Sequence, residues 1–500
     1  MRSKTRRPIL ALIGFCAGLS PASLRAGFLA VEGLAPDQVL QRADDLAGAE
    51  ARLSGRCSPG AAVVRLAALR QGLALEGLEG VEANVGGDGG WSLTVTLPVG
   101  GPYEVRLEAL DGRAQLLETR ALPGVMVGDL WVLAGQSNME GVALLEGAET
   151  PDGRVHVFDM ADRWDLAEEP LHNRAESVYP VYWNVRNPEQ GARREGEAAR
   201  RARESRTRGA GLGLAFAKRL AAETDVPIGL IPCAYGGTSM DQWSPALRER
   251  GSHALYGAML DRIAAAGGRV RGVLWYQGES DATPAAASAY EGKFQAFIEA
   301  LRRDLDRPDL PFYYVQLGRF VTETGSAEGW NVVREAQRRL ESRLSNVGVV
   351  AAVDLSLDDL IHVDTEGQKT LGRRLAALAG ADLFGDRPAF TGLERGPRVG
   401  GVTFEGGDRR RARVEFEQVN GRLRTEGRLS GFSCDAESGG APQPFKAFID
   451  PARPTSVVLL FPSELPPGAR LWYGRGLDPY CNLTDEAGMG ALAFGPWPLP

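Results

Sequence analysis

Near-continuous apolar runs, separated by stretches with helical periodicity, constrain the fold of this chain more than any other feature. Such runs, without polar alternation, are typical of parallel strands that are buried on both faces. Strands that alternate with helices form βαβ units around a parallel sheet. The sequence therefore predicts an α/β domain over residues 125–385, with strands in GVMVGDLWVLAG, VPIGLIPCAYGG, VRGVLWYQGES, LPFYYVQLG and VGVVAAVDLS.

The regions on either side of this domain have a different pattern. Residues 27–124 contain short stretches with period two, such as WSLTVTL and YEVRLEAL, which predict a small β-sandwich. Residues 386–500 return to short alternating runs, and a second β-rich domain is expected there. A chain of 500 residues is too long for one hydrophobic core, in agreement with several domains.

An insertion is expected at about residues 150–208, after the first strand of the α/β domain. Its last part, residues 192–208, is densely basic and contains almost no apolar side chains. Such a segment is typical of a solvated helix or a mobile insertion. The alternative is a cationic rim that attracts an acidic substrate.

The N-terminus, residues 1–26, has the pattern of a secretory signal peptide. A basic stretch is followed by a short apolar segment and by small residues up to Ala26. The apolar segment is too short to cross a bilayer, although a buried N-terminal helix is an alternative. We therefore expect a secreted or periplasmic protein without membrane insertion. A net charge of -7 argues against nucleic acid as the main partner.

The cysteines permit a disulfide but do not indicate a zinc site. Four of the five remain after the signal peptide. Cys434 and Cys481 lie in one C-terminal segment and are able to pair in an oxidising compartment. Cys57 and Cys233 are distant in sequence and are expected to be isolated, buried thiols. No CxxC or HxxxH spacing is present, so no metal centre is expected.

Polar residues at the predicted strand ends suggest nucleophilic chemistry. Ser137, in GQSNM, follows the first buried strand, and alone it is read as a helix cap. A serine nucleophile needs an adjacent base. The chain has only four histidines, and His362 has Asp359 three residues before it. A carboxylate at that spacing can orient the imidazole, although Asp354, Asp358 and Asp364 are nearby competitors.

Acyl transfer also needs donors for a developing oxyanion. Gly237, in YGGTS, can bring its backbone N–H close to a ligand because no side chain obstructs it. Gln277, in WYQGES, offers a side-chain amide at the end of another predicted strand. Each is an ordinary loop feature when taken alone.

The blocks GQSNM, GGTSMDQW, WYQGESDA and DLIHVDTEGQKTLGRRLA, in that order, resemble the sialate O-acetylesterase group of the SGNH hydrolases. The resemblance covers about residues 125–380. The segment VLQRADDLAGAEARLSGRCSPGAAV, followed by GGWSLTV and GGPYEV, also resembles the β-domain that precedes the hydrolase in that family. It implies a flavodoxin-like α/β/α sandwich, flanked here by the N- and C-terminal β-rich domains. It also implies removal of acetyl esters from sugars, without metal or cofactor.

The same resemblance assigns roles by motif. Ser137 would be the nucleophile, His362 the base and Asp359 the residue that orients the base. The oxyanion would be bound by the backbone N–H groups of Ser137 and Gly237 and by the Gln277 amide. Trp243, Gln316 and Arg334 lie in stretches that recur in the family, where they could contact substrate. The alternatives, core packing for Trp243 and a helix-surface charge for Arg334, are equally open. His172 is expected to be structural or substrate-facing.

We therefore expect an exported serine esterase that acts on an acetylated carbohydrate, with sialic acid, xylan and other glycans all open. The rival hypothesis is a carbohydrate-binding protein whose hydrolase domain is a catalytic relic. A relic should have lost a member of the triad, and none is missing. A lipase or thioesterase would need a long apolar lid, and none is found in the sequence. The oligomeric state is not predicted.

Overall fold

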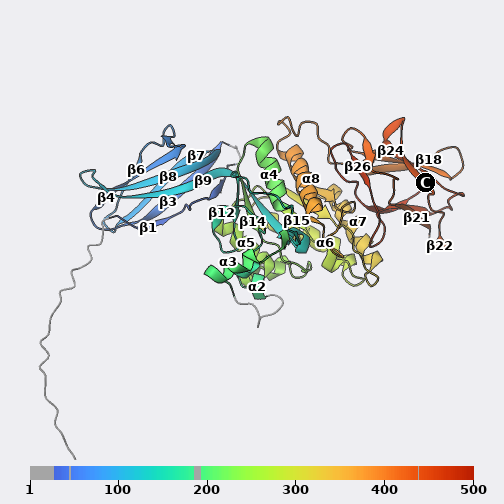
Figure 1. Cartoon of the computed structure of the whole chain (residues 1–500), viewed down its shortest axis with the longest axis horizontal. Helices are drawn as coiled ribbons and strands as arrows, with labels where there is room; N and C mark the ends of the chain where they lie inside the picture. Colours follow the sequence, from blue (N-terminus) through green and yellow to red (C-terminus); the bar gives the residue numbers. More distant parts are fainter. Residues whose placement is uncertain (1–26, 44–46, 185–192, 437–438) are drawn as a thin grey trace, which may run out of the picture.

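The computed structural model describes residues 27–43, 47–184, 193–436 and 439–500. The signal peptide predicted for residues 1–26 lies outside the described residues. The chain forms a central α/β domain between two β-rich domains, and each of the three has its own hydrophobic core (Figure 1).

The central domain is built on a parallel sheet with the strand order β14-β9-β15-β16-β17. Numbered along the chain, this order is 2-1-3-4-5, which is the flavodoxin-like arrangement. The strands are β9 (Leu116–Gly135), β14 (Ile228–Pro232), β15 (Gly272–Tyr276), β16 (Phe312–Gln316) and β17 (Val347–Ala351).

Two short strands extend this sheet beyond β14. Strand β11 (Val155–Phe158) pairs parallel with β14, and β12 (Trp164–Leu166) pairs antiparallel with β11. The segment expected as an insertion, about residues 150–208, thus adds two edge strands to the central sheet, which its sequence did not indicate. Sequence reasoning missed β11 because a run of four residues is too short to show a period.

Helices cover both faces of the central sheet (Figure 1). Successive residues of β16 show the two faces: the Tyr313 hydroxyl donates to Asp382 of α8, whereas the Tyr314 hydroxyl donates to the Gln337 carbonyl of α7. Helices α4 and α8 pack together, as do α6 and α7. The helices are α1 (Ser137–Glu140), α2 (Val181–Asn184), α3 (Gly196–Glu204), α4 (Gly213–Thr224), α5 (Leu255–Ala265), α6 (Tyr290–Asp304), α7 (Ala327–Arg343) and α8 (Thr365–Leu383).

The N-terminal domain is joined to the central sheet by a strand rather than by a linker. The first half of β9 pairs antiparallel with β8, and its second half pairs parallel with β14 and β15. A buried ion pair between Arg42 and Asp129, at 2.7 Å, lies beside this junction. The other strands of this domain are β1 (Phe28–Glu32), β2 (Val39–Gln41), β3 (Gly48–Cys57), β4 (Ala61–Arg70), β5 (Leu73–Ala74), β6 (Val81–Asn84), β7 (Gly90–Pro98) and β8 (Gly100–Asp111).

The C-terminal domain contains two four-stranded sheets, with the orders β18-β19-β24-β23 and β22-β21-β25-β27. Cys434 and Cys481 are buried in its core as free thiols, so the possible disulfide between them is not formed. Its main strands are β18 (Arg398–Phe404), β19 (Arg411–Glu417), β21 (Phe432–Ala436), β22 (Gly439–Gly440), β23 (Lys446–Asp450), β24 (Arg453–Leu460), β25 (Ala469–Tyr473) and β27 (Phe494–Pro498).

Two short pairings remain: β10 (Ala143–Leu144) pairs with β13 (Arg208–Ala210), and β20 (Leu423–Thr425) pairs with β26 (Leu483–Asp485). Among the described residues, no helix is both long enough and apolar enough to cross a membrane.

Candidate active site

The loops at the carboxyl ends of the central strands bring distant parts of the chain together. Ser137 follows β9, Gly236 and Gly237 follow β14, Gln277 follows β15, and His362 lies in the loop after β17. Ligands of open α/β sheets bind at this edge, where the strand order reverses. Here the reversal falls at β9, between β14 and β15.

Ser137, His362 and Asp359 form a continuous chain of hydrogen bonds. The His362 Nε2 lies 3.0 Å from the Ser137 Oγ, and the His362 Nδ1 lies 2.8 Å from the Asp359 Oδ2. Because the carboxylate only accepts, it favours a proton on Nδ1 and leaves the Nε2 lone pair facing the serine hydroxyl. The geometry is that of a nucleophile, a base and an orienting carboxylate.

Asp359 is held in place by its own loop. Its Oδ1 accepts from the backbone N–H groups of Ile361, at 3.0 Å, and His362, at 2.9 Å. Partial burial would raise the pKa of the Asp359 carboxyl, but the bonds from the His362 ring and these two N–H groups outweigh burial and lower it. The carboxylate therefore stays ionised through the neutral range.

The competing carboxylates near His362 have other partners. Asp354 is ion-paired with Arg374, Asp358 accepts from the Leu144 N–H at 2.8 Å, and Asp364 caps α8 by accepting from the Gly367 N–H at 2.7 Å. Of these acids, Asp359 is the one that contacts the imidazole.

Asn138, which sequence reasoning did not single out, braces the serine turn against the histidine loop. Its Nδ2 donates to the Glu279 carboxylate at 2.8 Å and to the Ile361 carbonyl at 3.3 Å. Its Oδ1 accepts from the Val363 N–H at 3.0 Å. Burial raises the pKa of the Glu279 carboxyl, whereas the hydrogen bond that Asn138 donates to it favours the ionised form. Asn138 thus fixes the residues on both sides of His362, a contact that residue spacing could not reveal.

The glycine loop after β14 packs directly against the serine turn. A Cβ on Gly236 would lie 3.2 Å from the Ser137 Cβ, so a side chain there would crowd Ser137. The Gly236 N–H donates to the Glu140 Oε2 at 2.7 Å. Gly237 is exposed and has a left-handed φ of 66°, which favours glycine. Of the two glycines, Gly237 therefore remains the candidate oxyanion donor.

The Gln277 side-chain amide is not free to donate to an oxyanion. Its side chain is fully buried, and its Nε2 donates to the Thr238 carbonyl at 3.0 Å and to the Asp281 Oδ2 at 2.6 Å. Both amide hydrogens are therefore engaged, which corrects the sequence-based prediction. Instead, Gln277 holds the carbonyl of Thr238, the residue after Gly237, in place.

Trp243 does not line the site: of its two expected roles, the structure shows core packing and not substrate contact. The ring is fully buried, packs edge-on against Trp275 with centroids 5.2 Å apart, and donates from Nε1 to the Thr238 Oγ1 at 2.9 Å. Trp243 is a core residue that also holds the glycine loop.

Arg334 and Gln316 join the central domain to the C-terminal domain and do not face substrate. The Arg334 guanidinium is 2% exposed and donates only to backbone carbonyls, including those of Gly474 at 2.9 Å and Gly476 at 2.6 Å. Gln316 exchanges two hydrogen bonds with the backbone of Ala493, at 2.7 and 2.8 Å. The predicted roles in substrate binding are thus replaced by a domain contact.

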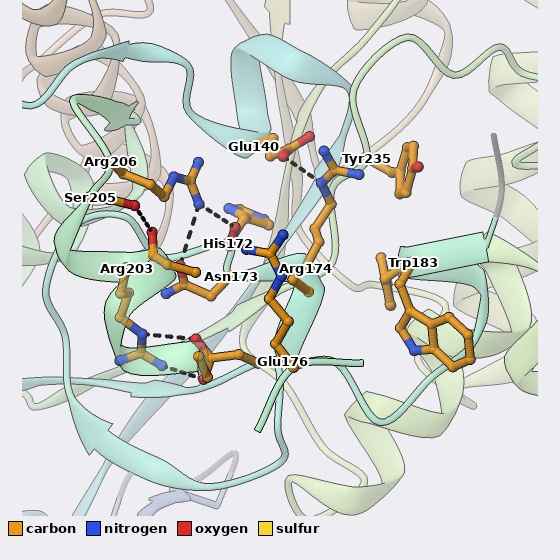
Figure 2. A pocket seen from close by; sticks show the side chains of 15 residues that line it. Glu140, His172, Asn173, Arg174, Glu176, Trp183, Arg203, Ser205, Arg206 and Tyr235 are labelled. Carbon is orange, nitrogen blue, oxygen red and sulfur yellow. Dashed lines mark hydrogen bonds and ion pairs between the residues drawn. The ribbon is translucent and has the colours of Figure 1, made fainter. Parts of the chain in front are cut away.

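A cavity of about 500 Å³ opens beside Glu140 of the serine turn and Tyr235, and its other walls come from residues 172–176, 182–183 and 194–206 (Figure 2). Glu140 and Tyr235 form its wall on the serine side, and Arg174 pairs with Glu140 at 2.6 Å. Figure 2 also shows Arg203 paired with Glu176, and Arg206 directed at neutral oxygen atoms. The described part of the basic segment thus lines a cavity.

His172 is buried at the back of this cavity, with 1% of its surface exposed. Burial lowers its pKa from 6.5 to about 3, so the ring is neutral at all physiological pH values. Within the described part of the chain, its ring makes no hydrogen bond to Ser137 or His362.

The flavodoxin-like strand order, with a serine–histidine pair at the carboxyl ends of the strands, defines the class of SGNH-type esterases. The model of the family described as "carbohydrate esterase, sialic acid-specific acetylesterase" matches residues 127–380. A probable carbohydrate esterase of Arabidopsis thaliana is 34% identical over 271 residues, which are 49% of this chain and 88% of that protein. The chain therefore belongs to this family and is a carbohydrate O-acetylesterase.

Other relatives agree with this placement. The human sialate O-acetylesterase is 25% identical over 334 residues, covering 58% of this chain and 59% of its own length. The crystal structure of a carbohydrate acetylesterase from Xanthomonas citri matches with a TM-score of 0.62 and 24% identity, over 92% of this chain and 98% of that one. This structural match covers all three domains, so the similarity in fold is not confined to the central α/β domain.

Proposed function

We propose that this carbohydrate O-acetylesterase acts as a serine esterase, with Ser137 as nucleophile, His362 as base and Asp359 as the residue that orients the base. The observation that carries the proposal is the unbroken chain of hydrogen bonds from Ser137 through His362 to Asp359. The same chain argues against the rival hypothesis of a catalytic relic, because a relic has no need to keep it.

In the proposed reaction the Ser137 Oγ attacks the acetyl carbonyl while its proton passes to the His362 Nε2. The backbone N–H groups of Ser137 and Gly237 stabilise the oxyanion. The ester bond to the sugar breaks, and His362 gives its proton to the departing sugar oxygen. Water then attacks acetyl-Ser137, loses a proton to His362 and releases acetate as Ser137 recovers its proton.

Replacing Ser137 with alanine tests this proposal. Ser137→Ala should leave the melting temperature near that of the wild type and lower kcat for 4-nitrophenyl acetate by several orders of magnitude. Turnover near the wild-type rate in a correctly folded variant would refute the role of Ser137.

For the sugar, we propose a substrate that carries a carboxylate, as sialic acid does, rather than neutral acetylated xylan. The support comes from Arg206 in the cavity beside Ser137. Its guanidinium donates to the carbonyls of Arg208 and His172, at 3.2 and 3.4 Å, and to the Asn173 amide oxygen at 3.3 Å. These acceptors are neutral, and Glu140 and Glu169 act on the Arg206 guanidinium only through charge attraction without a hydrogen bond, so a direct ion pair with an anionic ligand is still open to it.

Acetate release from a panel of acetylated glycans tests the choice of sugar. Acetylated sialic acid should have the higher kcat/KM, and Arg206→Ala should raise KM for it while leaving 4-nitrophenyl acetate, which has no carboxylate, unaffected. Equal rates on acetylated xylan would count against the proposal.

We also propose that the protein is exported, on the basis of the signal-like sequence of residues 1–26. Expression of the full chain in a bacterium, followed by N-terminal sequencing of the periplasmic or secreted form, tests this. Mature protein that begins after Ala26 is expected, and an intact N-terminus in the cytoplasm would contradict export.

A further inference from the structure

The side chain of Glu140 joins three separate segments beside the nucleophile. Glu140 lies in α1, three residues after Ser137, and only 5% of its surface is exposed. Its Oε2 accepts from the Gly236 N–H at 2.7 Å, and its Oε1 accepts from the Arg174 Nε at 2.6 Å. The serine turn, the glycine loop and the segment that carries Arg174 thus meet at one carboxylate, and Figure 2 shows its pairing with Arg174.

Arg174 offsets the energetic cost of burying the Glu140 carboxylate. A buried carboxylate is costly unless it is paired and hydrogen-bonded, and here one oxygen has a guanidinium and the other a backbone N–H. The Arg174 guanidinium also lies over the Tyr235 ring, 4.2 Å from its centroid, which limits its freedom to leave. The pair is therefore a fixed part of the wall between the cavity and the glycine loop.

The contact matters because it anchors the glycine loop on one side of Gly237. Glu140 holds the N–H of Gly236, and the Gln277 amide holds the carbonyl of Thr238 at 3.0 Å. Gly237 lies between these two anchors. Two consecutive glycines have wide backbone freedom, so without an anchor the Gly237 N–H would sample many directions.

We propose that Glu140, with its charge balanced by Arg174, is a positioning residue that fixes the Gly237 N–H relative to the Ser137 Oγ. This inference rests on the proposed function, in which Gly237 donates to the oxyanion. Glu140 itself does not touch the reacting atoms, since both of its oxygens are engaged by Gly236 and Arg174. An oxyanion donor contributes most when it is aimed before the reaction begins.

The main test is Glu140→Ala, assayed with 4-nitrophenyl acetate after titration of active serines with a fluorophosphonate. Expressing kcat per titrated site separates positioning from a loss of folded enzyme. We expect kcat per site to fall about 10- to 100-fold, less than for complete loss of a donor, with KM little changed. Affinity for phenylboronic acid, which forms a tetrahedral anion on serine, should fall by a similar factor.

Two further variants sharpen the test. Glu140→Gln keeps an acceptor for the Gly236 N–H, so its loss of kcat should be smaller, and it carries the test if the alanine variant does not fold. Glu341→Ala is the matched control: this largely buried carboxylate on α7 also accepts from a guanidinium, that of Arg398 at 2.8 Å, and from a backbone N–H, that of Val349 at 3.2 Å, but it lies outside the loops that carry Ser137, Gly237 and His362. Its kcat per site should match the wild type.

The outcomes separate this inference from the proposed function. If the wild type is active and Ser137→Ala is not, the serine esterase mechanism stands whatever Glu140 does. Unchanged kcat per titrated site and unchanged boronic acid affinity in the Glu140 variants would then overturn the positioning role alone. Inactive wild-type protein would overturn the proposed function.

Discussion

Replacing Arg334 with alanine should loosen the contact between the central and C-terminal domains. Arg334 lies on α7, and its guanidinium donates to five backbone carbonyls, those of Leu317, Gly318, Gly474, Gly476 and Leu477. Burial lowers its pKa to about 10, so it remains charged at neutral pH. Charged hydrogen bonds of this kind are stronger than neutral ones.

The size of the effect follows from what the substitution leaves behind. Each buried carbonyl that loses its donor costs about 1–3 kcal/mol, although water recovers part of this where the cavity fills. Because the acceptors are neutral carbonyls and no buried charge is orphaned, the total is set by these carbonyls and by the space left behind, and about 3–5 kcal/mol lies in the upper range for one substitution. We therefore expect Arg334→Ala to lower the free energy of unfolding by about 3–5 kcal/mol.

Denaturant unfolding and hydrogen exchange measure this loss. The peptide that spans residues 474–481 should exchange faster in Arg334→Ala, because its carbonyls lose their anchor. Arg339→Ala is the matched control on the same helix: its side chain is 45% exposed and pairs with Glu291 at 2.5 Å, so a change below about 1 kcal/mol is expected. Equal stability and exchange in the Arg334 variant and the control would refute the role of Arg334 as a domain contact.

Three further predictions concern the site. Asp359→Asn should lower kcat by about 10²–10⁴-fold, because an amide no longer holds the His362 tautomer; activity assays would disprove this if kcat stayed within a factor of a few. Gln277→Ala should lower both the melting temperature and kcat, since the Thr238 carbonyl loses its donor, and loss of kcat at full stability would restore the oxyanion role. His172 has a folded pKa of about 3, below its ordinary 6.5, so the unfolded chain takes up a proton first and stability falls as pH drops from 6.5 towards 3, by up to about 1.4 kcal/mol per pH unit. His172→Gln should remove this slope in denaturant titrations, whereas parallel slopes for both proteins would contradict it.

The sequence was sufficient to predict the parallel sheet, because strands buried on both faces leave uninterrupted apolar runs. The same patterns brought Ser137, His362 and Asp359 to one edge of that sheet, where the structure joins them by hydrogen bonds. The strand ends are informative because parallel strands all finish at the same edge.

Residues whose partners are remote could not be assigned from the sequence. Trp243 and Arg334 lie in sequences typical of the family, but only tertiary packing decides that they face the core and the C-terminal domain. Gln277 ends the expected strand, yet its amide points to Thr238 and Asp281. Glu140 stands three residues from Ser137, but its partners Gly236 and Arg174 are 96 and 34 residues away.

Trapping the acyl-enzyme tests the central claim most directly. The enzyme is mixed with 4-nitrophenyl acetate, quenched in acid within the first turnover, digested and examined by peptide mass spectrometry. The account predicts a single acetyl group on the peptide that contains Ser137, located at that residue by fragmentation and missing from Ser137→Ala. An active enzyme whose acetyl group is found on another residue, with Ser137 unmodified, would contradict it.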